Sequence, residues 1–229
     1  MTQLYSKFSL EKRSLMLFNL SEHNSIANHF VAELRDRQVQ KDRLRFRKNA
    51  HRLGQIMAYE ISRHMHYRNT PIETPLGTSV VNLMPEPPVI IAIMRAGLPY
   101  FQGFLDFFDQ SDAGFIGAYR QEGHTEIVIS LEYLATPSLA QREVILVDPM
   151  LATGKSIVQS VNALAKNGKP SHLYVASLVS VPEGIQYVNE NVDIPHSLWT
   201  CAVDDNLNDR FYIVPGLGDA GDLSFGEKL

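Results

Sequence analysis

Apolar residues run continuously, without polar alternation, through five short segments of this chain. They occupy residues 89–94, 115–119, 144–147, 173–179 and 198–203. Runs of this kind are typical of strands that are covered on both faces of a parallel sheet. Helical patterns follow several of these runs, at residues 98–108, 156–167 and 182–188. The alternation of strands and helices predicts an α/β fold with a right-handed, mostly parallel sheet.

One face of residues 34–65 is apolar at three- and four-residue steps, which predicts a largely helical region. This face consists of Phe46, Ala50, Leu53 and Met57. Residues 70–88 are rich in threonine, proline and glycine, which predicts an edge ribbon between the helical region and the core. Residues 127–133 predict a strand that pairs with a neighbour. Leu15 to Phe18 predict a short strand or a packing arm.

The stretch 144–156 reads as strand, loop and helix, with Asp148 at the end of the apolar run. The loop carries Thr153, Gly154, Lys155 and Ser156, whose backbone N–H groups, hydroxyls and ammonium suit a phosphate. Gly154-Lys155-Ser156 also resembles the end of a nucleotide-binding P-loop. That motif needs a glycine where this chain has Pro149, so the P-loop interpretation is disfavoured. A threonine-capped turn without a ligand is the other alternative.

Arginine follows two of the apolar runs, as Arg95 and as Arg120. A guanidinium at the end of a buried strand suits an anion, because its fork matches phosphate oxygens. A salt bridge to a nearby carboxylate is the alternative explanation.

The last part of the chain, residues 212–226, is rich in glycine and also contains apolar residues. Its glycines are Gly216, Gly218, Gly221 and Gly226. A glycine-rich loop can present backbone N–H and C=O groups closely to a ligand. A disordered tail is the alternative, but Tyr212, Ile213 and Val214 favour a segment that is packed on the core.

Composition limits the remaining possibilities. The 229 residues are 45% hydrophobic, which suits one domain with a substantial core. The net charge of −4 disfavours nucleic acid as a partner. Cys201 is the single cysteine, which excludes an internal disulfide and fits a reducing compartment. No apolar run approaches about 18 residues, so we expect no membrane span and a cytoplasmic protein.

The helical region 34–65 is strongly basic outside its apolar face. The basic residues are Arg35, Arg37, Lys41, Arg43, Arg45, Arg47, Lys48 and Arg52. Charges on a helix usually form a solvated face, which is the simpler interpretation here. A surface that binds an anionic effector or RNA is the alternative.

Four motifs together resemble a known family. The segment 147–156, VDPMLATGKS, resembles the 5-phosphoribosyl 1-diphosphate (PRPP) motif of type I phosphoribosyltransferases, and its DPMLATG form is particular to the uracil phosphoribosyltransferases. Three further motifs agree in order. They are MRAGL at 94–98, AYR at 118–120 and YIVPGLGDAGD at 212–222. The resemblance extends from about residue 34 to the C-terminus.

The resemblance implies a type I phosphoribosyltransferase fold. This fold has a central, mostly parallel sheet flanked by helices, a flexible flap over the active site and an N-terminal helical hood. In this chain we expect a single domain over residues 1–229. Its parts would be an N-terminal arm at 1–33, the hood at 34–68, and a core at 88–229 that ends in a uracil loop. The flap would lie within residues 124–138.

The implied reaction converts uracil and PRPP to uridine monophosphate (UMP) and diphosphate, a pentosyl transfer in pyrimidine salvage. The implied catalytic residues are Asp148, Arg95, Arg120 and Asp219. The implied PRPP-binding residues are Arg95, Arg120, Asp148, Pro149, Met150, Leu151, Ala152, Thr153, Gly154, Lys155, Ser156 and Asp219. The implied uracil-binding residues are Ile213, Gly218, Asp219 and Ala220.

The resemblance also implies Mg²⁺ that is bound with PRPP, without a separate protein metal site. The family forms dimers and higher assemblies, so we expect a homodimer or a higher homo-oligomer. Some relatives are activated by GTP, which makes GTP a candidate effector.

Lys155 departs from the family, which usually has glycine there. That glycine could serve a backbone conformation that lysine tolerates poorly.

Two other functions stay open at this point. One is a nucleotide-binding regulator of RNA built on the same fold, which the basic helix allows and the intact C-terminal loop disfavours. The other is an enzyme of the same fold that acts on another base, which the complete GLGDAGD segment disfavours.

Overall fold

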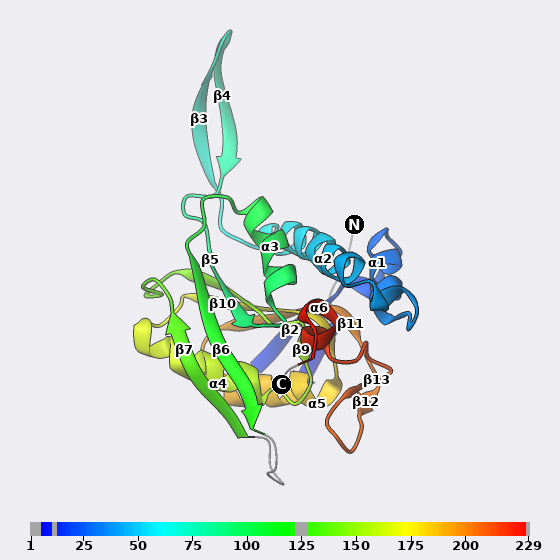
Figure 1. Cartoon of the computed structure of the whole chain (residues 1–229). Helices are drawn as coiled ribbons and strands as arrows, with labels where there is room; N and C mark the ends of the chain where they lie inside the picture. Colours follow the sequence, from blue (N-terminus) through cyan, green and yellow to red (C-terminus); the bar gives the residue numbers. More distant parts are fainter. Residues whose placement is uncertain (1–5, 11–12, 122–127, 228–229) are drawn as a thin grey trace.

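The structure is a computed structural model that describes residues 6–10, 13–121 and 128–227. A central nine-stranded sheet has the strand order β1-β2-β11-β10-β8-β5-β6-β7, and the short β9 pairs with β10 (Figure 1). The strands are β1 (Ser6–Leu10), β2 (Arg13–Asn19), β5 (Val89–Met94), β6 (Ala113–Gln121), β7 (Val128–Ala135), β8 (Glu143–Val147), β9 (Met150–Leu151), β10 (His172–Ser180) and β11 (His196–Val203).

The strands from β2 to β6 in that order are parallel, and only the outer pairs β1–β2 and β6–β7 are antiparallel. The predicted mostly parallel sheet is therefore confirmed. Leu15 to Phe18 form part of β2, which lies beside β11, so this segment is a strand of the main sheet.

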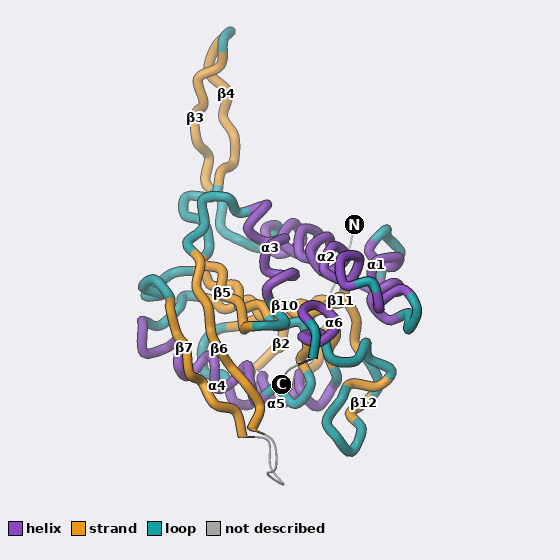
Figure 2. Tube along the Cα trace, in the orientation of Figure 1, coloured by secondary structure: helices purple, strands orange, loops and turns teal. Residues whose placement is uncertain are grey.

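Helices cover both faces of the sheet (Figures 1 and 2). One face carries α1 (Ala27–Arg35), α2 (Arg43–Ser62) and α3 (Leu98–Phe107), and the other carries α4 (Lys155–Leu164) and α5 (Pro182–Asn191). Successive residues of each central strand point to opposite faces. In β8, Ile145 and Val147 therefore join the first core, whereas Val144 and Leu146 join the second. This double burial explains why the central strands are uniformly apolar.

The predicted helical region 34–65 is confirmed in its main part, as α2. The apolar face that was predicted from the sequence is buried, with each of its side chains no more than 2% exposed. Helix α2 packs on α3 through glycines at close range: a Cβ atom on Gly54 would lie 2.1 Å from the carbonyl oxygen of Tyr100. Short 3₁₀ turns, η1 (Leu20–Glu22) and η2 (Val39–Lys41), flank α1, and η3 (Ala165–Asn167) follows α4.

The predicted ribbon is a hairpin, β3 (Arg68–Thr74) and β4 (Gly77–Leu83), that projects away from the body of the protein (Figure 1). It forms a sheet of its own and does not extend the core sheet. Apart from the half-buried Thr70, all of its side chains are exposed. The core therefore contributes little to holding it.

The chain from 206 to 226 is more regular than the predicted loop. Strands β12 (Asn206–Leu207) and β13 (Ile213–Val214) pair with each other, and the short helix α6 (Ala220–Phe225) follows. The Asp219 carboxylate caps this helix, because its Oδ1 accepts a hydrogen bond from the Asp222 N–H at 3.0 Å. The many glycines of this segment favoured a loop, so neither the helix nor its cap was predicted from the sequence.

The turn of the predicted flap, residues 122–127, lies outside the described residues, although β6 and β7 on either side pair as expected. Among the residues that are described, no helix is long and apolar enough to cross a membrane.

Candidate active site

The strand order reverses between β5 and β8, which are neighbours in the middle of the sheet. From β5 the chain moves outward to β6, and from β8 it moves outward to β10 on the other side. In open parallel sheets, ligands bind at the carboxyl ends of the strands beside such a switch point. Arg95 follows β5 and Asp148 follows β8, so both predicted residues lie at this point.

The two strand ends approach each other closely. A Cβ atom on Gly97 would lie 3.0 Å from the carbonyl oxygen of Val147, the residue before Asp148. The loop after β5 is therefore packed against the end of β8, and the absence of a side chain at Gly97 makes this approach feasible. The peptide bond between Met94 and Arg95 is cis.

Asp148 is buried, with only 9% of its surface exposed. Burial raises the pKa of its carboxyl group to about 7, and the hydrogen bond from the Met150 N–H to Oδ1 offsets this only in part. A buried carboxylate with a single backbone donor has capacity for further donors. The carboxyl group is therefore suited to accept hydrogen bonds from hydroxyl groups of a ligand.

The predicted phosphate loop lies between β9 and α4, and Gly154 is the N-cap of that helix. Gly154 has a left-handed backbone with φ of 75°. Lys155 is the first residue of α4, so the lysine does not need the unusual conformation that we considered from the sequence. The positive φ falls on the glycine beside it. The Lys155 N–H donates to Oγ1 of Thr153 at 3.5 Å, whereas the N–H groups of Ser156 and Ile157 in the first turn of α4 are open to an anion.

Helix α5 supports this loop through direct backbone contact. A Cβ atom on Gly184 would lie 2.1 Å from the carbonyl oxygen of Ala152, and one on Gly154 would lie 2.8 Å from the carbonyl oxygen of Gly184. Pro149 to Leu151 form the base of the loop. The Pro149 carbonyl accepts hydrogen bonds from the N–H groups of Leu178 and Val179, so the loop is firmly attached to β10.

Arg95 connects the switch point to the C-terminal segment. Its Nη2 lies 3.2 Å from Oδ1 of Asp222 and donates to the carbonyl oxygen of Gly226 at 3.1 Å. The salt bridge that we considered as an alternative is therefore present. The Nε of Arg95 is buried and has no hydrogen-bond partner among the described residues, which leaves a donor for a ligand.

Asp219 lies in the same group of side chains. A Cβ atom on Gly221 would lie 3.1 Å from Oδ1 of Asp219 and 3.9 Å from Nη2 of Arg95. The structure therefore brings together Arg95, Asp219 and the start of α6. Predicted uracil-binding residues Ile213 and Ala220 are buried, 4% and 3% exposed, and would offer backbone groups rather than side chains.

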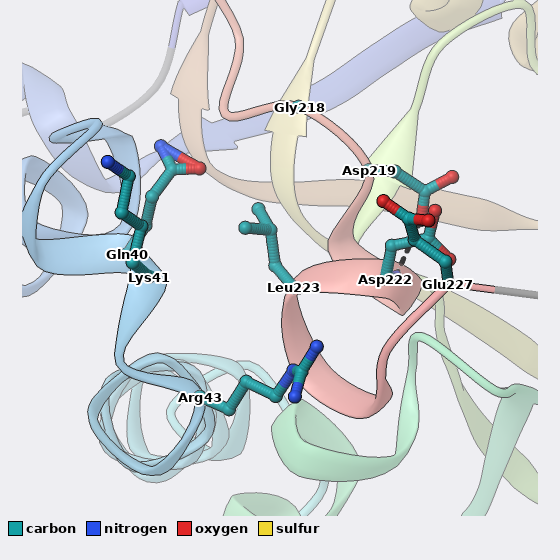
Figure 3. Close-up of a pocket in the computed structure, with 8 residues that line it drawn as sticks. All are labelled: Gln40, Lys41, Arg43, Gly218, Asp219, Asp222, Leu223 and Glu227. Carbon is teal, nitrogen blue, oxygen red and sulfur yellow. Dashed lines mark hydrogen bonds between the residues drawn. The ribbon is translucent and has the colours of Figure 1, made fainter.

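An open cavity of about 350 Å³ lies beside Gly218, between the C-terminal segment and the region where α2 begins (Figure 3). Its lining residues are Gln40, Lys41, Arg43, Gly218, Asp219, Asp222, Leu223 and Glu227. Figure 3 shows Arg43 and Lys41 on one side and the carboxylates of Asp219 and Asp222 on the other.

Arg120 is the one predicted catalytic residue that the structure does not place fully. Its backbone lies in β6, opposite Ile129 of β7. Its side chain lies outside the described part of the structure.

Six of the eight basic residues in the helical region are exposed, as expected for a solvated face, but several of the eight also make internal contacts. Arg45 makes a bidentate pair with Glu33, Arg52 donates to Asn49, and Arg47 donates to the carbonyl oxygen of Ser224 at 2.7 Å. These contacts disfavour the interpretation of the region as an RNA-binding surface. They also involve the C-terminal segment, which no periodicity in the sequence indicated.

A metal ion would need ligands from outside the protein. In the described ranges, no group of three or more His, Cys, Asp and Glu side chains could hold one. Mg²⁺ is often bound by one or two carboxylates together with substrate phosphates. The carboxylates of Asp148 and Asp219 suit that mode of binding, in which the ion arrives with an anionic substrate.

Comparison with known proteins agrees with this geometry. The family model for uracil phosphoribosyltransferase matches residues 20–227. Uracil phosphoribosyltransferase from Porphyromonas gingivalis is 40% identical over 93% of this chain and 99% of its own length. The enzyme of that name from Lactococcus lactis subsp. cremoris is 38% identical over 92% and 99%.

Among solved structures, the AQ2163 protein from Aquifex aeolicus has a TM-score of 0.82 and is 28% identical. The match covers 92% of this chain and 98% of that one. The family match includes all four motifs and both sides of the switch point. The chain belongs to the uracil phosphoribosyltransferase family.

Proposed function

We propose that this chain transfers the 5-phosphoribosyl group of PRPP to uracil and forms UMP and diphosphate. One observation of the structure carries the proposal. At the switch point of the sheet, Asp148 and a phosphate loop lie beside Arg95, and Arg95 is bonded to the C-terminal segment that would hold the base. The proposed sites for the sugar phosphate and for the base would therefore be adjacent.

The phosphate loop would bind the 5′-phosphate of PRPP. Residues 152–156 offer the open N–H groups of the first turn of α4 and the hydroxyls of Thr153 and Ser156. The carboxylate of Asp148 would accept hydrogen bonds from the ribose 2′- and 3′-hydroxyls. These bonds would replace the hydration that Asp148 lost on burial, and they would hold the anomeric carbon in a fixed direction.

Negative charge develops on the leaving diphosphate as its bond to the anomeric carbon breaks. Arg95 would stabilise this charge through its unpartnered Nε and its Nη atoms, and we assign the same role to Arg120. Mg²⁺ bound with PRPP would neutralise part of the diphosphate charge. Asp219 would hold a metal-bound water or stabilise the positive charge that develops on the ribose.

Selectivity for uracil would come from backbone groups of the C-terminal segment. Uracil presents acceptor, donor and acceptor at O2, N3 and O4, which Ile213 and Gly218 to Ala220 would match with donor, acceptor and donor. Cytosine presents the opposite groups at N3 and N4. A buried site of this kind rejects a mismatched base by roughly 10⁴-fold or more.

The hairpin β3–β4 supports a homo-oligomer. Its exposed apolar side chains are Ile72, Leu76, Val80, Val81 and Leu83. An isolated two-stranded hairpin is only marginally stable in water, so we propose that a second copy of the chain covers it. Sedimentation should give a dimer or a larger assembly, and replacing Leu76 and Val80 with serine should weaken it.

The cytoplasmic location remains a proposal, which the single, buried Cys201 supports. GTP as an activator is also a proposal, and adding GTP to the assay below would test it. We propose the division into arm, hood and core as predicted from the sequence, in which α2 lies within the hood and α1 spans the boundary between arm and hood.

The experiment that tests the activity supplies PRPP and Mg²⁺ with uracil, cytosine, hypoxanthine or orotate in parallel. We expect UMP from uracil and no nucleotide from the other three bases. Asp219→Ala should abolish the product. Formation of no nucleotide from any base would overturn the proposal, and UMP-dependent RNA binding would then be the next measurement.

A further inference from the structure

A buried ion pair lies behind the proposed base site. Arg35, the last residue of α1, makes a bidentate contact with Asp204, which follows β11. The two distances are 2.9 Å from Nη1 to Oδ2 and 2.6 Å from Nη2 to Oδ1. The side chain of Asp204 is 5% exposed and that of Arg35 is 22% exposed.

Both members of the pair also bind the backbone of Gly216. Oδ2 of Asp204 accepts a hydrogen bond from the Gly216 N–H at 2.9 Å, and Nη1 of Arg35 donates to the Gly216 carbonyl at 3.1 Å. The N–H and C=O of one residue are therefore both fixed by the same ion pair. Charge-assisted bonds of this kind are stronger and more directional than neutral ones.

Gly216 occupies a critical position in the proposed base site, between Ile213 and Gly218. Its φ of 60° is left-handed, and a Cβ atom there would lie 2.1 Å from the carbonyl oxygen of Ile213. Gly216 therefore packs directly on Ile213, whose N–H would donate to uracil. A shift of Gly216 would move the Ile213 carbonyl and the chain that leads to Gly218.

The structure assigns Arg35 and Asp204 as positioning residues for uracil, which set the backbone of the base site through Gly216. This inference rests on the proposed function, because it names the groups that orient the same site. Neither side chain is a predicted substrate ligand. The pair also makes the base site depend on α1, which is distant in sequence and ends where the proposed hood begins.

The test is Arg35→Lys, which keeps the charge but loses the planar fork. Asp204→Asn is the second variant, since it keeps an acceptor for the Gly216 N–H but loses the charge. The measurements are KM for uracil at saturating PRPP and KM for PRPP at saturating uracil. Binding of UMP and of ribose 5-phosphate is measured separately, because only UMP carries the base.

We expect both variants to raise KM for uracil about tenfold or more and KM for PRPP less than twofold. Binding of UMP should weaken by a similar factor, whereas binding of ribose 5-phosphate should not change. The matched control is Arg45→Lys, because Arg45 of α2 makes a bidentate pair with Glu33 of α1, the helix that also carries Arg35, and does not contact residues 212–226 in any described bond. This control should leave both KM values unchanged.

Thermal unfolding is followed for all three variants, and the kinetics are measured well below each transition. Equal changes in both KM values, unchanged KM for uracil, or equal loss of UMP and ribose 5-phosphate binding would overturn the inference. If both Arg35→Lys and Asp204→Asn fail to fold, the pair is structural and the inference is wrong. Failure of the wild-type protein to make UMP would instead overturn the proposed function, and this inference with it.

Discussion

The proposed phosphate loop and the proposed base segment are built in different ways. The functional groups of the phosphate loop are local in sequence, because strand, carboxylate, glycine and helix follow one another within residues 144–164, although α5 and β10 support the loop. The base segment is held from distant parts of the chain, by Arg35 of α1, Arg47 of α2 and Arg95 after β5. A local site can be recognised from a short motif. The residues that support a site through remote contacts cannot be recognised in the same way.

The comparison also concerns electrostatics. In the phosphate region, Asp148 is buried with one backbone donor, and its pKa is raised as a result. In the base region, the buried Asp204 is paired with an arginine and accepts a backbone N–H. Asp148 has no cationic partner in the described structure, which suits the binding of a ligand. Asp204 is paired with Arg35, which suits the positioning of the backbone.

The largest expected effect follows from Asp148→Asn. We expect kcat/KM for PRPP to fall by about 10²- to 10³-fold, because an amide is a poorer acceptor for two ribose hydroxyls and adds donors to the site. KM for uracil should change little, which would sharpen the contrast between the two regions. Steady-state kinetics with each substrate varied in turn measure this, and an equal rise in both KM values would contradict it.

The next effect comes from Gly184→Ala. The new Cβ atom would lie 2.1 Å from the Ala152 carbonyl oxygen, which is backbone, so the phosphate loop or α5 must move. We expect PRPP binding to weaken by about 10- to 100-fold and the protein to lose about 1–3 kcal/mol of stability. Titration with PRPP and chemical denaturation measure the two effects. Unchanged PRPP affinity would show that the loop does not depend on this contact.

The raised pKa of Asp148 predicts a dependence on pH. For the free enzyme, kcat/KM for PRPP should fall below about pH 7, because the protonated carboxyl group is a poorer acceptor. At lower pH it should approach a tenfold loss per pH unit. A profile of kcat/KM for PRPP measured from pH 5 to 9 tests this. The decrease at acidic pH should be absent in Asp148→Asn.

The same group predicts the sign of a stability change. The pKa of about 7 in the folded state lies above the usual aspartate pKa of 3.8, so between these pH values the folded state binds more protons than the unfolded state. The contribution of Asp148 to stability should therefore decrease as pH rises from about 4 to 7. Asp148→Asn should be more stable than wild type at pH 8, and this gain should shrink toward pH 4. Denaturation at both pH values, without substrate, checks the sign.

The smallest expected effect comes from Arg47→Met, which keeps the apolar stem and removes the bond to the Ser224 carbonyl at the end of α6. We expect a loss of about 1 kcal/mol in the free energy of unfolding and a rise in KM for uracil of a fewfold. KM for PRPP should be unchanged. A larger change in KM for PRPP than in KM for uracil would contradict the distinction between the two regions.

Much of the fold could be predicted because its signals are local. The doubly covered strands appear as apolar runs such as 144–147, and the apolar face of α2 appears as a three- and four-residue period. The strand–loop–helix unit at residues 144–164 could be located because an apolar run, Asp148, Gly154 and a helical pattern follow one another within a few residues. The family motifs then indicated the reaction and the substrates.

Other features were decided by contacts between residues that are far apart in the chain. The capped helix α6 was hidden by its glycines. The basic residues of 34–65 are mostly exposed, as expected for a solvated face, but the contacts of Arg35 and Arg47 with the C-terminal segment were not predicted. No spacing in the sequence links Arg35 to Asp204, which is 169 residues away, or either one to Gly216. The hairpin β3–β4 was predicted as an edge ribbon, but it pairs with no strand of the main sheet.

The sequence alone therefore determined the alternation of strands and helices, the doubly buried sheet and the phosphate loop with its carboxylate, because hydrophobic period and loop chemistry act over a few residues. The tertiary structure alone decided which strands meet at the switch point, which arginines hold the base segment, and how far burial raises the pKa of Asp148. Those properties depend on distances and desolvation, and only the folded chain sets them.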